Sequence, residues 1–274
     1  PKPIRPLGRL LLEPQFKRNE RIFKNATAIF SVSNSYLDWA LGFAKRPRGM
    51  ADGVFPLVYP ESGVGNEELE EGRRVLLAAG VQPRNCICCF FGQFERSYDL
   101  DTVLKAARIL LDAGEDDVQF VLCGSGKKSA SMKGVANDLK NVVLPGWVSY
   151  PTLHTLLGMS QIGLAPYSRT ALQSLPNKPI EYLAGGLPVI SSLRGELHEL
   201  LETHSCGIYY EAGNASQLAS AILYLKDNKK IMNEMSKNAR LLYESKFSDH
   251  IVLPKMINRL ESIADGSISN DNSG

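Results

Sequence analysis

The sequence predicts an α/β protein built on a doubly wound parallel sheet. Short apolar runs alternate with longer amphipathic stretches over most of the chain after residue 63. The runs are apolar at successive positions, as in residues 86–91 and 118–123, which indicates strands buried on both faces. Alternation of such strands with helices is typical of a parallel sheet covered on both sides.

Each element of the main domain has a local reason. Residues 67–79 show helical spacing of apolar side chains and end at Gly80, while residues 101–112 gather their apolar side chains on one helical face. The expected strands are 86–91, 118–123, 141–144, 162–166, 188–191 and 207–210. The expected helices are 67–79, 101–112, 152–159, 177–184, 197–202, 217–226, 229–246 and 248–264, with a short polar helix after Gly126.

The N-terminal part of the chain is less regular. The first 15 residues are rich in Pro and Arg and are expected to be irregular, followed by the end of a helix at 20–25. A buried strand is expected over 26–33 and a helix over 35–43, and residues 60–65 have the composition of a linker. We therefore place domain boundaries at 1–62, 63–248 and 249–274, the last being a C-terminal helix and a disordered polar tail.

Composition excludes several classes of protein. The chain is 44% hydrophobic and 22% charged, and its 31 basic and 29 acidic residues give a net charge of +2, so nucleic acid is not an expected partner. No apolar run approaches the ~20 residues of a membrane span. The first 24 residues are basic, which fits either a solvated end or a peripheral contact with an anionic membrane surface. The basic residues concerned are Lys2, Arg5, Arg9, Lys17, Arg18, Arg21 and Lys24.

The five cysteines are expected to be free thiols. Cys86, Cys88, Cys89 and Cys123 lie in strand-like runs, and an odd number favours a reducing, cytoplasmic compartment. Cys86 and Cys89 form one C-x-x-C, which we interpret as core packing rather than a redox or zinc motif. No metal site is predicted, since the four histidines show no metal-ligand spacing with the cysteines.

Two loops that follow predicted strands contain candidate functional residues. The loop Gly124-Ser125-Gly126 fails the P-loop spacing, because Val121 stands where the first glycine should be. We interpret it as a tight turn that needs glycine for backbone freedom, with a backbone contact to a ligand as the alternative.

The second loop leads into the helix expected over 177–184. Asn177 is the expected N-cap, and the free N–H groups of a helix start at the carboxyl edge of a sheet attract anions. Lys178 adds a positive charge there, and Glu181 lies on the same helical face. A carboxylate beside a phosphate site can accept two hydrogen bonds from a ribose diol. A surface ion pair between Lys178 and Glu181 is the competing interpretation.

One segment of the chain is Pro176-Asn177-Lys178-Pro179-Ile180-Glu181-Tyr182-Leu183-Ala184-Gly185-Gly186-Leu187-Pro188-Val189-Ile190. This segment resembles the donor-site signature of GT-B glycosyltransferases, in particular glycosyltransferase family 4. The resemblance extends over residues 63–265. Further segments similar to that family are Gly92 through Ala107, Val143 through Val148, Leu164 through Tyr167, Cys206 through Tyr210, Asn238 through Arg240, and Phe247-Ser248.

The resemblance implies a Rossmann-like donor-binding domain beside an incomplete second domain. It implies that this donor-binding portion transfers a sugar from a nucleotide diphosphate sugar to a glycan or lipid-linked acceptor, with retention of configuration, in polysaccharide or glycolipid biosynthesis. It implies that Glu181 binds the ribose and that Lys178, with amides near Asn177, holds the pyrophosphate. It further implies a hexosyltransferase-type enzyme that needs no divalent metal or other cofactor. The other donor-binding residues that it implies are Gly92, Arg96, Gln173, Gly146, Trp147 and Val148.

The chain also departs from the family's pattern. Gln173 stands where the family has its first acid, and the first donor loop has Arg96 but no lysine, with a salt-bridge or solvent role as the alternative for Arg96. Residues 1–62 resemble only a remnant of the N-terminal acceptor domain, so an acceptor-domain subunit is a possible partner and the catalytic residues are not assigned. A non-catalytic nucleotide-sugar-binding subunit or inactive fragment is the alternative, and a GT-B sugar-nucleotide epimerase is a third. Trp147 and Trp39 are assigned mainly to packing, whereas Tyr98, Tyr150 and Tyr167 are left open as cleft residues.

Overall fold

The computed structural model describes residues 6–60 and 63–269, with side chains from residue 12 onward. It divides into two compact units, one comprising Pro1–Val58 and Lys246–Gly274 and the other Tyr59–Ser245. The chain passes between the units at residues 58/59 and 245/246, a few residues from the domain boundaries expected from the sequence. The two units are described separately below.

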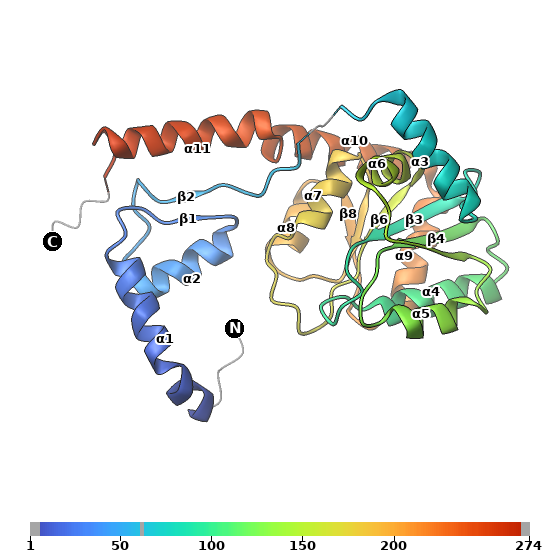
Figure 1. Ribbon diagram of the computed structural model, residues 1–274, viewed down its shortest axis with the longest axis horizontal. Coiled ribbons are helices and arrows are strands. Elements are labelled where there is room, and N and C mark those ends of the chain that lie inside the picture. Colours follow the sequence, from blue (N-terminus) through green and yellow to red (C-terminus); the bar gives the residue numbers. More distant parts are fainter. Residues whose placement is uncertain (1–5, 61–62, 270–274) are drawn as a thin grey trace. The chain divides into compact units, whose positions relative to one another are not determined.

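The larger unit contains a six-stranded sheet in which all strands are parallel, in the order β5-β4-β3-β6-β7-β8 (Figure 1). The predicted doubly wound parallel sheet is thereby confirmed. Strands β3 and β4 have the predicted bounds, and the others differ by one or two residues at an end. The strands are β3 (Cys86–Phe91), β4 (Val118–Cys123), β5 (Val142–Gly146), β6 (Ile162–Ala165), β7 (Val189–Ser191) and β8 (Gly207–Tyr209).

Helices cover both faces of this sheet, with α4, α5 and α9 on one side and α3 and α6 on the other (Figure 1). Their order along the chain alternates with the strands as expected. The helices are α3 (Asn66–Ala78), α4 (Leu100–Asp112), α5 (Ser129–Ala136), α6 (Tyr150–Met159), α7 (Asn177–Ala184), α8 (Glu196–Thr203), α9 (Ala215–Asp227) and α10 (Lys229–Lys246).

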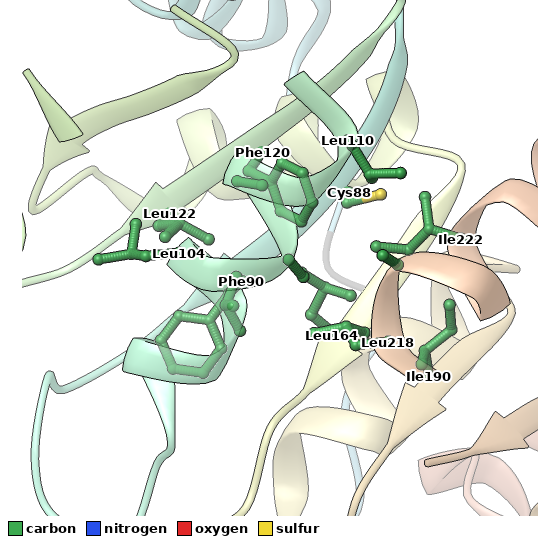
Figure 2. Close-up of a cluster of buried hydrophobic side chains, with 14 of the residues drawn as sticks. Cys88, Phe90, Leu104, Leu110, Phe120, Leu122, Leu164, Ile190, Leu218 and Ile222 are labelled. Atoms are coloured by element: carbon green, nitrogen blue, oxygen red, sulfur yellow. The ribbon is translucent and has the colours of Figure 1, made fainter. Parts of the chain in front are cut away.

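The main core lies between the sheet and helices α4 and α9 (Figure 2). Alternate residues of β3 and β4, such as Cys88, Phe90 and Phe120, point into it and are fully buried. All five cysteines are free, four of them are buried, and Cys86 is half-buried. Burial raises the pKa of the Cys89 thiol to about 12, which keeps it protonated and unreactive. The interpretation of these cysteines as core residues is therefore confirmed.

The smaller unit has a parallel pair of two-residue strands, β1 (Phe30–Ser31) and β2 (Gly53–Val54), with helices α1 (Pro6–Lys24), α2 (Asn34–Ala44) and α11 (Asp249–Ala264). The expected irregular N-terminus is wrong for residues 6–15, which belong to α1 even though Pro14 lies inside the helix. Packing explains this, since aromatic rings of α1 pack against α2. Phe16 stacks on Phe43 at 5.9 Å, and Phe23 meets Trp39 edge-to-face at 6.1 Å. The expectations for residues 1–5 and 270–274 lie outside the described residues.

The strand expected over 26–33 is much shorter, because side-chain bonding replaces sheet pairing at its start. The amide of Ile29 donates to Asp52 Oδ1 at 2.8 Å, not to a neighbouring strand. The same carboxylate accepts from Gly49 N at 2.8 Å and from both terminal nitrogens of Arg46 at 2.6 and 2.8 Å. The Asp52 side chain is fully buried, so this ion pair joins β1, β2 and the preceding turn.

Replacing Asp52 by Asn should destabilise the smaller unit by roughly 3–5 kcal/mol, because Arg46 then remains buried without its counterion. Burial opposes the ionisation of Asp52, but the hydrogen bonds from Arg46, Gly49 and Ile29 outweigh it and lower the pKa to about 2. A lowered folded-state pKa stabilises above the unfolded value of 3.8, and this stabilisation is lost as the pH falls towards 2.

The measurement is urea unfolding followed by Trp39 fluorescence in a Trp147→Phe background, which removes the other tryptophan. Asp38→Asn is the matched control, since Asp38 is exposed on α2. A difference between the two variants that shrinks below pH 4 supports this account. Equal stability of the two variants at pH 7 contradicts it.

Candidate functional site

The sheet order reverses between β3 and β6, and ligands of such sheets bind outside the carboxyl ends of the strands at this point. Two loops meet there. The amide of Asp99 donates to the carbonyl of Pro166 at 2.7 Å, and the amide of Ser168 donates to the carbonyl of Ser97 at 2.9 Å. These bonds fix the loop after β3 against the loop after β6, so the backbone at this edge of the sheet is held in place.

Three glycines continue the carboxyl ends of β3, β4 and β5 in a row. Gly92 N donates to the carbonyl of Cys123 at 2.9 Å, and Gly124 N donates to the carbonyl of Gly146 at 2.7 Å. All three have positive φ, at 137°, 142° and 83°. A Cβ on Gly124 would lie 1.8 Å from the carbonyl oxygen of Gly92. The loops are therefore in van der Waals contact at positions where only glycine fits.

Helix α7 begins at this crevice with the bounds predicted from the sequence. The expectation that Asn177 is the N-cap is wrong, because Pro176 occupies that position and no side chain caps the helix. Asn177 is instead the first helical residue and is exposed. Pro179 falls in the first turn, where its missing N–H needs no partner. The uncapped first-turn amides of α7 are consequently available to an anion.

The side chain of Lys178 contacts the loop after β3. A Cβ on Gly92 would lie 2.4 Å from Cε and from Nζ of Lys178, so the side chain rests directly on this glycine. Its ammonium lies 4.7 Å from the ring centroid of Tyr98 and 5.7 Å from that of Phe90. No carboxylate of the described chain is within 4.0 Å of it, so the surface ion pair with Glu181 is not formed.

Glu181 lies one turn further along α7 and is half-buried. Burial raises the pKa of its carboxyl above the usual value of 4.5, and the positive charge of Lys178 opposes this shift. Within residues 6–60 and 63–269 its carboxylate has no hydrogen-bond or ion-pair partner. A half-buried carboxylate without a partner can accept two hydrogen bonds from a bound ligand.

The other predicted residues lie around this centre. Arg96 is exposed in the loop after β3, and no carboxylate of the described chain pairs with it, so its salt-bridge alternative is not observed. Gln173 lies in the loop before α7, where its Oε1 is buried without a partner in the described structure. Trp147 follows β5 with 73% of its surface exposed, which differs from the packing role expected for it, and Val148 is half-buried.

The sequence left Tyr98 and Tyr150 open as cleft residues and gave neither a role, and it did not identify Tyr59 or His154. Tyr98 lies under the Lys178 ammonium, and its role depends on two loops far apart in the sequence. A second group joins Tyr59 to His154 of α6 by a 2.9 Å hydrogen bond between Oη and Nε2, with Tyr150 against the His154 ring at 4.5 Å. Burial raises the pKa of Tyr59, with smaller contributions from Tyr150 and from Glu181. Nothing in the local pattern of these residues predicts that they cluster.

Two further findings concern metal sites and membrane spans in the described part of the chain. Among the described side chains, no group of three or more His, Cys, Asp or Glu could hold a metal ion. No helix that the structure describes is both long enough and apolar enough to cross a membrane.

Comparison with known proteins agrees with this geometry. Residues 79–242, which carry β3 through α9 and most of α10, match the family described as glycosyl transferases group 1. The chain belongs to this family. The resemblance to GT-B glycosyltransferases that the sequence suggested is therefore confirmed, and the matched region contains every donor-binding residue predicted from the sequence.

Individual members of the glycosyl transferases group 1 family and related structures add detail. The chain is 29% identical over 171 residues to the amylovoran biosynthesis glycosyltransferase AmsK of Erwinia amylovora, covering 60% of this chain and 42% of AmsK. Among solved structures, HepE of Anabaena in complex with UDP matches 91% of this chain and 68% of its own, with TM-score 0.72 and 14% identity. Sucrose-phosphate synthase of Thermosynechococcus elongatus matches 93% and 62%, with TM-score 0.71 and 17% identity. The chain thus spans about two fifths of the length of AmsK.

Proposed function

We propose that the larger unit binds a nucleotide diphosphate sugar and that the protein transfers the sugar to an acceptor. The observation that carries the proposal is the unpaired Lys178 ammonium, held on Gly92 at the switch point of the sheet beside the start of α7. An unpaired cation next to free helix amides is suited to a diphosphate. HepE, a structure with the same fold, is described in complex with UDP, which supports this choice of ligand.

The roles of the residues follow from their positions. Lys178 and the first-turn amides of α7 would neutralise the diphosphate as it leaves the sugar, so that the charge developing in the transition state meets a preorganised positive field. Glu181 would accept hydrogen bonds from the ribose hydroxyls with its unpaired carboxylate. In this proposal the protein itself, and not a metal ion, supplies the positive charge that stabilises the leaving diphosphate.

The transferred sugar is assigned to the side of the crevice near Gln173, whose buried and unpartnered Oε1 can accept a hydrogen bond from a sugar hydroxyl. We propose that the protein transfers a hexosyl group with retention of configuration. We further propose that this transfer takes place in the cytoplasm and belongs to polysaccharide or glycolipid biosynthesis. The relationship to AmsK, named for amylovoran biosynthesis, supports a glycan or lipid-linked acceptor. The acceptor site and the catalytic residues are not assigned, and an acceptor-domain subunit is a proposed partner.

Calorimetric titration of the purified chain with UDP, GDP and ADP tests the proposal. Binding of one of these diphosphates in preference to its nucleoside monophosphate is the expected result, because Lys178 and α7 are placed to bind a diphosphate. A folded protein that binds none of the three at millimolar concentration would refute it.

Lys178→Ala should weaken binding of the preferred nucleoside diphosphate by roughly tenfold to 100-fold, the value of one charge-assisted hydrogen bond. Lys133→Ala is the matched control, because Lys133 is exposed in the last turn of α5. The same titration measures both variants. If the two variants bound the nucleoside diphosphate with equal affinity, Lys178 would not take part in binding it.

A non-catalytic nucleotide-sugar-binding subunit is the second candidate. The observation in its favour is Gln173, which stands where the family resemblance leads us to expect an acid. Incubation with the donor and with a candidate acceptor-domain subunit separates the two. Turnover that is lost in a Glu181→Ala variant would support the transferase, whereas tight donor binding without turnover would support the subunit. Conversion of the donor sugar without any acceptor would instead indicate the epimerase.

A further inference from the structure

Lys178 is unusual among the lysines of the larger unit in resting on aromatic rings. Its ammonium has three N–H donors, and none of them donates a hydrogen bond to a residue in the described part of the chain. A lysine in that situation ordinarily extends into water, where it is hydrated and loses no rotamer freedom. Here the side chain crosses Gly92 and places Nζ 4.7 Å from the centre of the Tyr98 ring.

Tyr98 is well suited to hold a cation in place, because its backbone is anchored on both sides. Ser97 accepts the amide of Ser168, and Asp99 donates to Pro166, so both neighbours of Tyr98 are bonded to the loop after β6. The Asp99 side chain also caps α4, accepting from Thr102 N at 3.2 Å and from Thr102 Oγ1 at 2.7 Å. The backbone that carries the ring is therefore fixed by the loop after β6 on both sides and by the start of α4 on one side.

Neighbouring rings fix the orientation of Tyr98. The Phe90 ring packs against it at 5.1 Å with an interplanar angle of 69°, and the Tyr167 ring at 5.2 Å with an angle of 44°. Phe90 and Tyr167 are both fully buried, and the Lys178 ammonium lies over the Tyr98 ring. A cation over an aromatic face is attracted by the ring quadrupole, more strongly when water is partly excluded.

We infer that Tyr98 is a positioning residue that holds the Lys178 ammonium on Gly92, ready for the diphosphate of the donor. The inference rests on the proposed function and adds the group that orders its principal cation. Preorganisation of this kind raises affinity because the lysine loses its rotamer freedom during folding and not during binding. The hydroxyl of Tyr98 is not required for this role, since the ring face supplies the attraction.

A double-mutant cycle with Lys178→Ala tests the coupling. Tyr98→Leu should weaken binding of the preferred nucleoside diphosphate about threefold to tenfold, and Tyr98→Phe should restore most of the affinity. In the Lys178→Ala background the same Tyr98→Leu change should alter affinity less than about twofold, because Tyr98 acts through Lys178. Tyr224→Leu, at an exposed tyrosine of α9, is the control for loss of a ring elsewhere. An equal loss of affinity in both backgrounds would overturn the inference.

A second measurement needs no nucleotide. In protein labelled with 13C at lysine Cε, the ring current of Tyr98 should shift the ε-methylene protons of Lys178 upfield. This displaced signal should vanish in Lys178→Ala and in Tyr98→Leu but persist in Tyr98→Phe. Its absence from the wild-type spectrum would overturn the inference whatever the affinities are. A displaced signal in a protein that binds no nucleoside diphosphate would show instead that the contact exists and that the proposed function is wrong.

Discussion

Replacing Glu181 by Gln is expected to weaken nucleoside diphosphate binding by roughly 100-fold while leaving the fold intact or slightly more stable. The loss corresponds to two hydrogen bonds from ribose hydroxyls to a charged acceptor, about 3 kcal/mol in all. Stability moves the other way because the carboxylate is half-buried without a partner. Burial raises the folded-state pKa, so the ionised form present at pH 7 is destabilising, and its removal should raise the melting temperature.

The same carboxyl group gives binding a pH dependence of known sign. Because ribose hydroxyls donate to the ionised form, affinity should fall as the pH drops through the raised pKa of Glu181. The Glu181→Gln variant should lose this dependence, and titrations between pH 4.5 and 8 compare the two. Glu199→Gln, at an exposed glutamate of α8, is the matched control for removing one negative charge. Retained affinity in Glu181→Gln, with its melting temperature unchanged, would remove Glu181 from the site.

The local sequence pattern was sufficient to predict the bounds of an element where a characteristic residue stands at each of its ends. The bounds of α7 were predicted because Pro179 belongs in a first turn and Gly185 at a helix end. Its N-cap was predicted wrongly as Asn177, because Pro179 suits the first turn whether Asn177 is the cap or the first helical residue. Strand β3 was equally clear, since its continuous apolar run is typical of a strand buried on both faces.

Contacts between distant segments were beyond the reach of the sequence. The end of α1 was predicted, but its first part was missed because Pro14 argues against a helix there, whereas packing of Phe16 and Phe23 against α2 stabilises it. In the same way, Lys178 was identified as a cation at a helix start, but its support by Tyr98 depends on two loops brought together only by the sheet. The charged groups of the site were therefore predictable, and the contacts that position them were not.

Replacing Gly124 by Ala should be the most disruptive single-methyl change in the larger unit. The new Cβ would lie 1.8 Å from the carbonyl oxygen of Gly92, and the φ of 142° is unfavourable for any side chain. Relief requires the loop after β3 to move, at a cost of about 3 kcal/mol. This corresponds to a fall of roughly 6–12 °C in melting temperature.

The displacement should also reach the ligand site, since Gly92 is the surface on which Lys178 lies. Nucleoside diphosphate affinity should therefore fall at temperatures where Gly124→Ala is still folded, by an amount comparable to that of Lys178→Ala. Gly134→Ala supplies the matched control, because its Cβ would meet nothing within 4 Å in helix α5 and should stabilise by about 0.5–1 kcal/mol. Equal melting temperatures for the two variants would mean that the glycine row does not set the geometry of the crevice.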